Sequence, residues 1–237
     1  MRTGLDAAPD AVGPRRLPEG GDVTPKPYYQ DERSGITIYH GDCREILPDL
    51  LGLFDLLLTD PPYGIRAAKR GAHSSIRDCD RWPEAEWDDK TVSDAVAQAV
   101  ARARLAMVWG GNYYTDVLPP SSSWLAWIKP EAGTGFSLAD MELCWTNLGC
   151  AARVRFAPWR DGHAHLTQKP VAVMAWCIAL APKDMSTILD PFMGFGTTLR
   201  AAKDIGRCAI GIEIEERYCE IAANRMRQGV LFGGPTP

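Results

Sequence analysis

The sequence predicts an α/β fold in which helices cover both faces of a doubly wound, mostly parallel sheet. Short apolar runs of strand length alternate along the chain with segments of helical periodicity. The run 54–59 is largely apolar, which is typical of a parallel strand buried on both faces. This run and a second one at 186–189 each end at an aspartate followed by proline, as strands do at a binding crevice.

Length and composition fit one globular domain. The chain has 237 residues, of which 46% are hydrophobic and 24% are charged. A formal net charge of −4 argues against a protein that coats nucleic acid nonspecifically, although it leaves room for a local basic face. No apolar stretch reaches membrane-spanning length, and we expect a cytoplasmic protein with no membrane segment.

The cysteine and histidine patterns favour neither disulfides nor a metal site. Seven cysteines are scattered without a C-x-x-C pair, which is typical of reduced thiols. His163 and His165 are the only pair with ligand spacing, and they lack a partner at a recognised distance. We therefore expect no bound metal.

The order of elements follows from these patterns. We expect a disordered tail at 1–30, one domain at 31–228 and a frayed tail at 229–237, since the ends lack periodicity. Strands are predicted at 36–39, 54–59, 105–109, 124–129, 141–146, 186–189 and 207–212. Helices are predicted at 43–51, 94–104, 171–180, 199–205 and 215–227.

The turn after 54–59 reads Asp60-Pro61-Pro62-Tyr63. Two prolines cannot continue a sheet, so the turn is rigid. Asp60 and the Pro61 carbonyl can then both accept hydrogen bonds from one small group, while Tyr63 lies flat against it. An exocyclic amine on a stacked base fits this description, and a plain proline turn is the alternative.

Two loop segments carry basic residues that suit contact with phosphates. The segment 65–90 has no apolar pattern and is basic before it turns acidic, so it is either a mobile lid or a solvated insertion. The segment 147–165 mixes basic and aromatic residues, as nucleic-acid contacts do, although a loop with packed aromatics is nearly as good an interpretation. The candidate DNA contacts are Arg66, Lys69, Arg70, Arg77, Arg153, Arg155 and Arg160.

The segment 186–213 has the pattern of a nucleotide-binding half-sheet: a strand, a Gly194-x-Gly196 turn, a helix, and a strand ending at Glu213. Glu213 is placed to accept both hydroxyls of a ribose. A dinucleotide site would have a third glycine where this chain has Leu199. Asp190 would also repel a pyrophosphate, whereas it suits a cationic amino group such as that of a methionine moiety.

Three motifs together resemble a known family. Asp60-Pro61-Pro62-Tyr63, then Thr167-Gln168-Lys169-Pro170, then Asp190-Pro191-Phe192-x-Gly194-x-Gly196-Thr197-Thr198, are similar to those of S-adenosylmethionine-dependent DNA amino-methyltransferases. This family acts on adenine N6 or cytosine N4, and the motif order resembles its circularly permuted beta group. His165-Leu166 departs from the His-Pro that is usual there.

The resemblance implies a seven-stranded, mostly parallel sheet of the Rossmann-like methyltransferase type, with both motifs at the topological switch point. It assigns catalysis to Asp60, Pro61, Pro62 and Tyr63. S-adenosyl-L-methionine would be the cofactor. The ribose would bind Glu213, the carboxylate Thr167 and Lys169, and the adenine would lie near Asp42. The remaining residues expected at the cofactor are Asp190, Phe192, Gly194, Gly196 and Thr197.

The implied activity is methylation of adenine N6 in DNA, because Asp at the first motif position is more usual for adenine and Ser for cytosine N4. A nicotinamide-dependent oxidoreductase would keep the sheet but would not explain residues 60–63. A nucleic-acid-binding protein without activity would not need both motifs intact. A homodimer and a partner restriction nuclease of a restriction-modification system are left open by the sequence.

The basic segment generates a prediction. Replacing Arg70 and Arg77 with Ala should weaken DNA binding and make the negative slope of log affinity against log salt shallower by about 2, since each lost phosphate contact removes roughly one counterion. Binding titrations between 50 and 200 mM salt would measure it. An unchanged slope would reduce the segment to a spacer.

Overall fold

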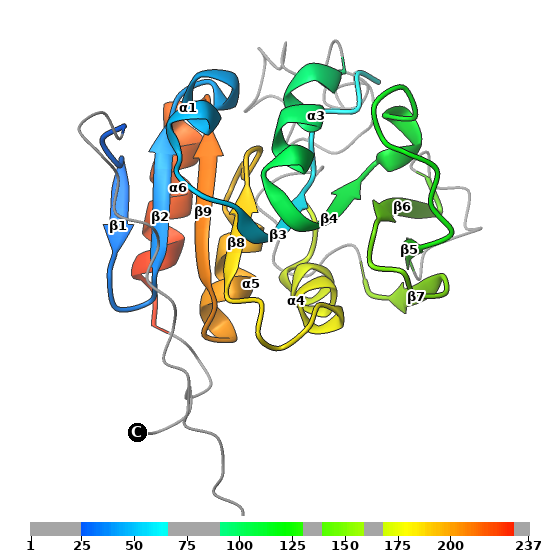
Figure 1. Cartoon of the computed structure of the whole chain (residues 1–237). Helices are drawn as coiled ribbons and strands as arrows, with labels where there is room; N and C mark the ends of the chain where they lie inside the picture. The colour runs from blue at the N-terminus through cyan, green and yellow to red at the C-terminus, as the bar shows by residue number, and fades with distance from the viewer. Residues whose placement is uncertain (1–24, 66–90, 130–138, 159–167, 230–237) are drawn as a thin grey trace, which may run out of the picture.

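The computed structural model describes residues 25–65, 91–129, 139–158 and 168–229, which form one nine-stranded sheet covered by helices (Figure 1). The strand order is β1-β2-β9-β8-β3-β4-β6-β5-β7. Its centre consists of parallel neighbours: β2 (Ile36–His40), β9 (Cys208–Glu213), β8 (Thr187–Asp190), β3 (Phe54–Thr59) and β4 (Ala103–Trp109). Because these strands are parallel, their carboxyl ends meet at one edge of the sheet.

The outer strands make the sheet mixed. β6 (Met141–Thr146) runs antiparallel to both β4 and β5 (Trp124–Ile128). At the two edges, β7 (Arg153–Phe156) pairs parallel with β5, and β1 (Tyr29–Asp31) pairs antiparallel with β2.

The seven strands predicted from the sequence all occur, but the expected total of seven is wrong. The sheet has nine strands, because β1 and β7 extend it at its edges. β1 begins inside the predicted tail 1–30, and β7 lies inside the predicted loop region 147–165. Neither has an apolar run: β1 has three residues, and all four residues of β7 are exposed. Backbone pairing with the neighbouring strand holds them in place.

Helices cover both faces, as the doubly wound prediction requires. On one face α4 (Val171–Leu180), α5 (Thr197–Asp204) and α6 (Glu216–Arg227) share a buried core with Leu56 and Leu58 of β3. On the other, α1 (Cys43–Asp49) and α3 (Ser93–Ala101) pack against Leu57. Alternate side chains of β3 therefore pack into two separate hydrophobic cores, one on each face of the sheet. A short 3₁₀ helix, η3 (Gly111–Tyr113), follows β4.

Within the described ranges, no helix is both long enough and apolar enough to cross a bilayer.

Asp55 on β3 fixes how that strand meets β8. The residue is 7% exposed, and its side chain accepts hydrogen bonds from the backbone N–H groups of Ser186 and Thr187, each at 3.0 Å, and from the Thr187 hydroxyl at 2.8 Å. The backbone N–H of Asp55 donates back to the same hydroxyl at 3.0 Å. These bonds align the two strands whose ends carry the motifs at 60–63 and 190–198.

We expect Asp55→Ala to lower the free energy of unfolding by about 3 kcal/mol, because two buried backbone N–H groups lose a charged acceptor. Urea denaturation at pH 7 would measure the change. Asp116→Ala, at an exposed turn position, serves as the control and should change stability by less than about 0.5 kcal/mol. Equal stability of the two variants would contradict the role given to Asp55.

Candidate functional site

A cavity of about 420 Å³ lies at the carboxyl ends of the central strands. Asp60 enters it from the end of β3 and Gly194 from the loop after β8, although the two are far apart in sequence. The prediction that both motifs open onto one pocket is therefore confirmed. Expected site residues that line it are Asp42, Asp60, Pro61, Pro62, Tyr63, Lys169, Asp190, Phe192, Gly194, Thr197 and Glu213.

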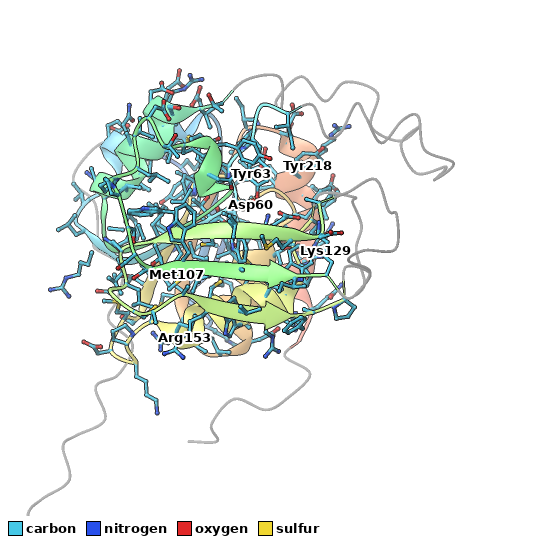
Figure 2. The ribbon with its side chains drawn as sticks, turned by 90° about the vertical axis from the view of Figure 1, so that its right-hand side faces the viewer. Asp60, Tyr63, Met107, Lys129, Arg153 and Tyr218 are labelled. Atoms are coloured by element: carbon cyan, nitrogen blue, oxygen red, sulfur yellow. The ribbon has the colours of Figure 1, made fainter. Side chains whose placement is uncertain are left out.

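Other expected residues lie elsewhere. Gly196 does not line the cavity but is the N-cap residue directly before α5. Arg153 and Arg155 lie on the edge strand β7, and Figure 2 shows Arg153 toward the opposite end of the sheet from Asp60 and Tyr63. Thr167, Arg66, Lys69, Arg70, Arg77 and Arg160 lie outside the described residues, as do His163 and His165.

The glycine turn needs its glycines for two different reasons. Gly194 and Gly196 have φ of 50° and 72°, in the left-handed region that side chains disfavour. A Cβ on Gly196 would also lie 2.9 Å from the Cβ of Ala222, so α5 could not pack as closely on α6. The turn thus brings backbone close to the cavity and fixes the start of α5.

Glu213 ends β9 beside this turn. Its Oε2 accepts the N–H of Gly194 and its Oε1 the N–H of Glu215, both at 2.9 Å. Burial nevertheless raises the pKa of Glu213 to about 7. Each carboxylate oxygen keeps a second lone pair, so hydroxyl groups of a ligand can still donate to it.

Asp190 is the second buried acid on this side of the cavity, with 2% exposure. Its Oδ1 accepts the Thr59 hydroxyl at 2.7 Å and the N–H of Phe192 at 3.2 Å. Burial raises the pKa of Asp190 to about 6. An incoming cation would stabilise the ionised form, which suits the amino group expected there.

Asp42 lies at the mouth of the cavity. It caps α1 by accepting the backbone N–H of Arg44 at 2.9 Å. The Arg44 guanidinium also bonds both carboxylate oxygens, which holds the pKa of Asp42 below its ordinary value. The adjacent backbone of Gly41 donates to the carbonyl of Glu213 at 2.9 Å.

Lys169 is buried beside Asp60. Its Nζ is 2.6 Å from Oδ1 of Asp60, 2.9 Å from Oε2 of Glu142 and 2.9 Å from the hydroxyl of Tyr63. An ammonium has three N–H donors, so all three are occupied. The side chain is 2% exposed. In this arrangement Lys169 pairs with two acidic residues. Its expected contact with a cofactor carboxylate stays a prediction.

Asp60 has two different oxygens. Oδ1 accepts from Lys169 and, at 2.6 Å, from the Tyr63 hydroxyl. No described residue donates to Oδ2, which is the oxygen left to bind a ligand. Burial raises the pKa of Asp60, Glu142 raises it further, and Lys169 opposes both.

The ring of Tyr63 stacks on Tyr113, with centroids 5.0 Å apart and planes 17° from parallel. A Cβ on Gly110 would lie 2.0 Å from the Tyr63 ring, so only glycine fits there. Behind the same turn, the Tyr114 hydroxyl donates to the carbonyl of Pro62. The stacking of Tyr63 on a base stays a prediction.

The sequence interpretation missed several polar residues of the cavity. Glu142, which is half-buried, forms an ion pair with the buried Lys129 at 2.9 Å, and Gln168 donates to the Thr197 hydroxyl at 2.9 Å. One signal was present: Glu142 is the only charged residue within the apolar strand 141–146. Across the described ranges, no group of three metal-binding side chains occurs.

Comparison with known proteins gives a consistent family. A family model described as DNA methylase matches residues 87–224. The Type II methyltransferase M.ScaI of Streptomyces caespitosus is 28% identical over 257 residues, covering 85% of this chain and 84% of that protein. M.HinfI of Haemophilus influenzae is 38% identical over 84 residues, covering 35% of this chain and 23% of that protein.

Solved structures agree on the fold. The M1.HpyAVI–SAM complex is 22% identical with a TM-score of 0.56, covering 81% of this chain and all of that one. The cytosine-N4-specific PvuII DNA methyltransferase is 14% identical with a TM-score of 0.63, covering 88% of this chain and 91% of that one. At these identities the likeness shows a shared Rossmann-like methyltransferase fold.

The raised pKa of Glu213 generates a prediction. Its folded value of about 7 exceeds the ordinary 4.5, so the folded state binds more protons between these values. Stability should therefore fall as pH rises from 4.5 to 7. In Glu213→Gln, the loss of stability between pH 5 and pH 8 should shrink by roughly 1 to 3 kcal/mol.

Urea denaturation at the two pH values would measure this difference, which does not depend on the backbone hydrogen bond that the amide loses. Glu220→Gln, an exposed acid on α6, should keep the wild-type difference. A Glu213→Gln variant with the wild-type difference would show that Glu213 ionises normally.

Proposed function

Because the chain belongs to the DNA methylase family of S-adenosylmethionine-dependent DNA amino-methyltransferases, we propose that it methylates the exocyclic N6 of adenine in DNA. The observation that carries the proposal is the shared cavity, in which the acceptor motif at Asp60 faces the glycine turn at Gly194. Asp at the first motif position favours adenine over cytosine N4 by family analogy. The order of the motifs supports the permuted arrangement.

The glycine side of the cavity fits S-adenosylmethionine. We propose that Asp190 holds the amino group, that Glu213 accepts the ribose hydroxyls and that the backbone at Gly194 lies against the methionine part. Two buried acids with raised pKa values support this choice, since a cationic ligand stabilises their ionised forms. Bound S-adenosylmethionine supplies a methyl group on a positively charged sulfur.

The Asp60 side acts on the amine. The lone pair of an adenine N6 is delocalised into the ring, so the nitrogen is a poor nucleophile while the amine stays planar. We propose that Oδ2 of Asp60 and the carbonyl of Pro61 accept its two hydrogens and turn the lone pair toward the methyl group. Positioning and fixed dipoles then supply most of the catalysis. As the nitrogen bonds to the methyl carbon, the carbon–sulfur bond would break and leave a neutral thioether. Asp60 need not take a proton during transfer, because the methylated amine is then a strongly acidic cation that loses a proton to water afterwards.

The base must leave the duplex to reach this buried turn. We propose that it lies against Tyr63 and that basic residues outside the cavity hold the phosphates. Of the two described candidates, Arg155 is nearer to the site. It pairs in register with Trp127, two residues before the cavity residue Lys129, whereas Arg153 pairs with Leu125. The named Type II relatives favour a role in a restriction-modification system.

Product analysis tests the proposal. The purified chain is incubated with S-adenosylmethionine and unmethylated genomic DNA, which is then digested to nucleosides for mass spectrometry. N6-methyldeoxyadenosine is the expected product. N4-methyldeoxycytidine would establish the other activity of the family, and the absence of both would overturn the proposal.

Asp60→Ala should reduce methyl transfer by at least about 100-fold, because the amine loses its charged acceptor. Affinity for S-adenosylmethionine should stay close to that of the wild type, since the cofactor residues lie across the cavity. Tritium transfer from labelled cofactor and calorimetry would measure the two effects. Turnover near the wild-type value would contradict the role of Asp60, and Asp116→Ala provides the control for folding and handling.

A further inference from the structure

Four charges of alternating sign, two buried lysines and two half-buried carboxylates, lead from β5 to the acceptor turn at residues 60–63. Lys129 lies 2.9 Å from Oε1 of Glu142, whose Oε2 lies 2.9 Å from Nζ of Lys169. The same Nζ lies 2.6 Å from Oδ1 of Asp60. These side chains come from four segments: the end of β5, β6, the residue before Pro170 at the start of α4, and the turn after β3.

The stability of the fold does not by itself require this charge row of Lys129, Glu142, Lys169 and Asp60. Removing two lysines and two carboxylates from water is costly, and well-packed apolar side chains in their place are often as stable. β6 is otherwise apolar where it enters the core, with Cys144 and Trp145 buried. A glutamate at this position of β6 therefore indicates a role in the cavity that it faces.

Glu142 restricts the orientation of the Lys169 ammonium. The ammonium has three donors, directed to Asp60, Glu142 and the Tyr63 hydroxyl. With Glu142 in place, the ammonium is held against Oδ1 of Asp60. Without it, one N–H would be free to turn toward Oδ2, the oxygen that the amine needs.

We propose that Glu142 is a positioning residue for methyl transfer, which keeps Lys169 on Oδ1 of Asp60 and so leaves Oδ2 open to the amine. This inference rests on the proposed function. Lys129 completes the arrangement: its side chain is 9% exposed, and it neutralises the second oxygen of Glu142. Its Nζ also lies 5.1 Å from the centre of the Trp127 ring.

The charge row also has a consequence for pH. The groups around Asp60 are Lys169 before α4, Glu142 and Cys144 on β6, Asp190 on β8, and Tyr63 in the turn itself. Lys129 after β5 pairs with Glu142. Glu142 raises the pKa of Asp60, and Lys169 lowers it. Since Asp60 must be ionised to accept the amine, turnover falls as pH drops through its pKa. Removal of the Glu142 charge should move this acid limb to lower pH.

The test compares Glu142→Gln with the full wild-type chain by tritium transfer to DNA under saturating conditions. We expect kcat at the optimum pH to fall roughly 10- to 100-fold, the cost of a misplaced acceptor. The acid limb of kcat should shift to lower pH, and the Kd for S-adenosylmethionine should change less than about twofold, a difference of only about 0.4 kcal/mol. Glu220→Gln should leave all three quantities unchanged.

Two further measurements keep the inference falsifiable. If Glu142→Gln folds poorly, the double variant Lys129→Met with Glu142→Gln removes both charges and should show the same loss of kcat and the same shift. Wild-type kcat and an unmoved acid limb, or a loss of kcat that only follows the folded fraction, would overturn the inference. A wild-type chain that methylates no DNA would instead overturn the proposed function.

Discussion

The site depends on one ammonium group whose three N–H donors are all occupied. Lys169 joins the acceptor turn after β3, the antiparallel strand β6 and the start of α4 at a single buried point. A buried ammonium is stable only with such partners, and its charge in turn stabilises the ionised form of both carboxylates. The ion pairs of Lys169 with Asp60 and Glu142 therefore hold three segments that are distant in sequence in one geometry. The contact with Lys169 also fixes the orientation of the Asp60 side chain in the rigid proline turn.

The two halves of the cavity differ in charge balance: carboxylates are paired with lysines in one half and have no such partner among the described residues in the other. On the Asp60 side, two lysines balance two carboxylates, and the pKa of Glu142 is lowered to about 2. On the glycine side, no described lysine or arginine pairs with Asp190 or Glu213, and burial raises the pKa of both. An unbalanced acidic half gains stability from a cationic ligand, whereas a balanced half accepts a neutral one. This division matches a positively charged methyl donor facing a neutral amine.

The features that could be predicted from the sequence are those that a local residue pattern encodes. Strands such as β3 are apolar runs, and the motifs at 60–63 and 190–198 are contiguous. Sequence reasoning missed β1 and β7, because edge strands this short and exposed are held by pairing rather than by composition. It also missed the contact of Lys169 with Glu142, since that contact depends on how α4 and β6 approach each other across the fold. A charged residue within an apolar strand was the one local sign of that contact.

The distance between the motif after β3 and the motif after β8 is set by the sheet rather than by loops. β3 and β8 are hydrogen-bonded neighbours, and Asp55 ties the start of β8 to β3. At their other ends, the Thr59 hydroxyl donates to Asp190 across the same pair of strands. Because both motifs begin at these fixed ends, neither can shift without breaking a buried hydrogen bond. The separation of the two motifs across the cavity is therefore fixed by the pairing of β3 with β8.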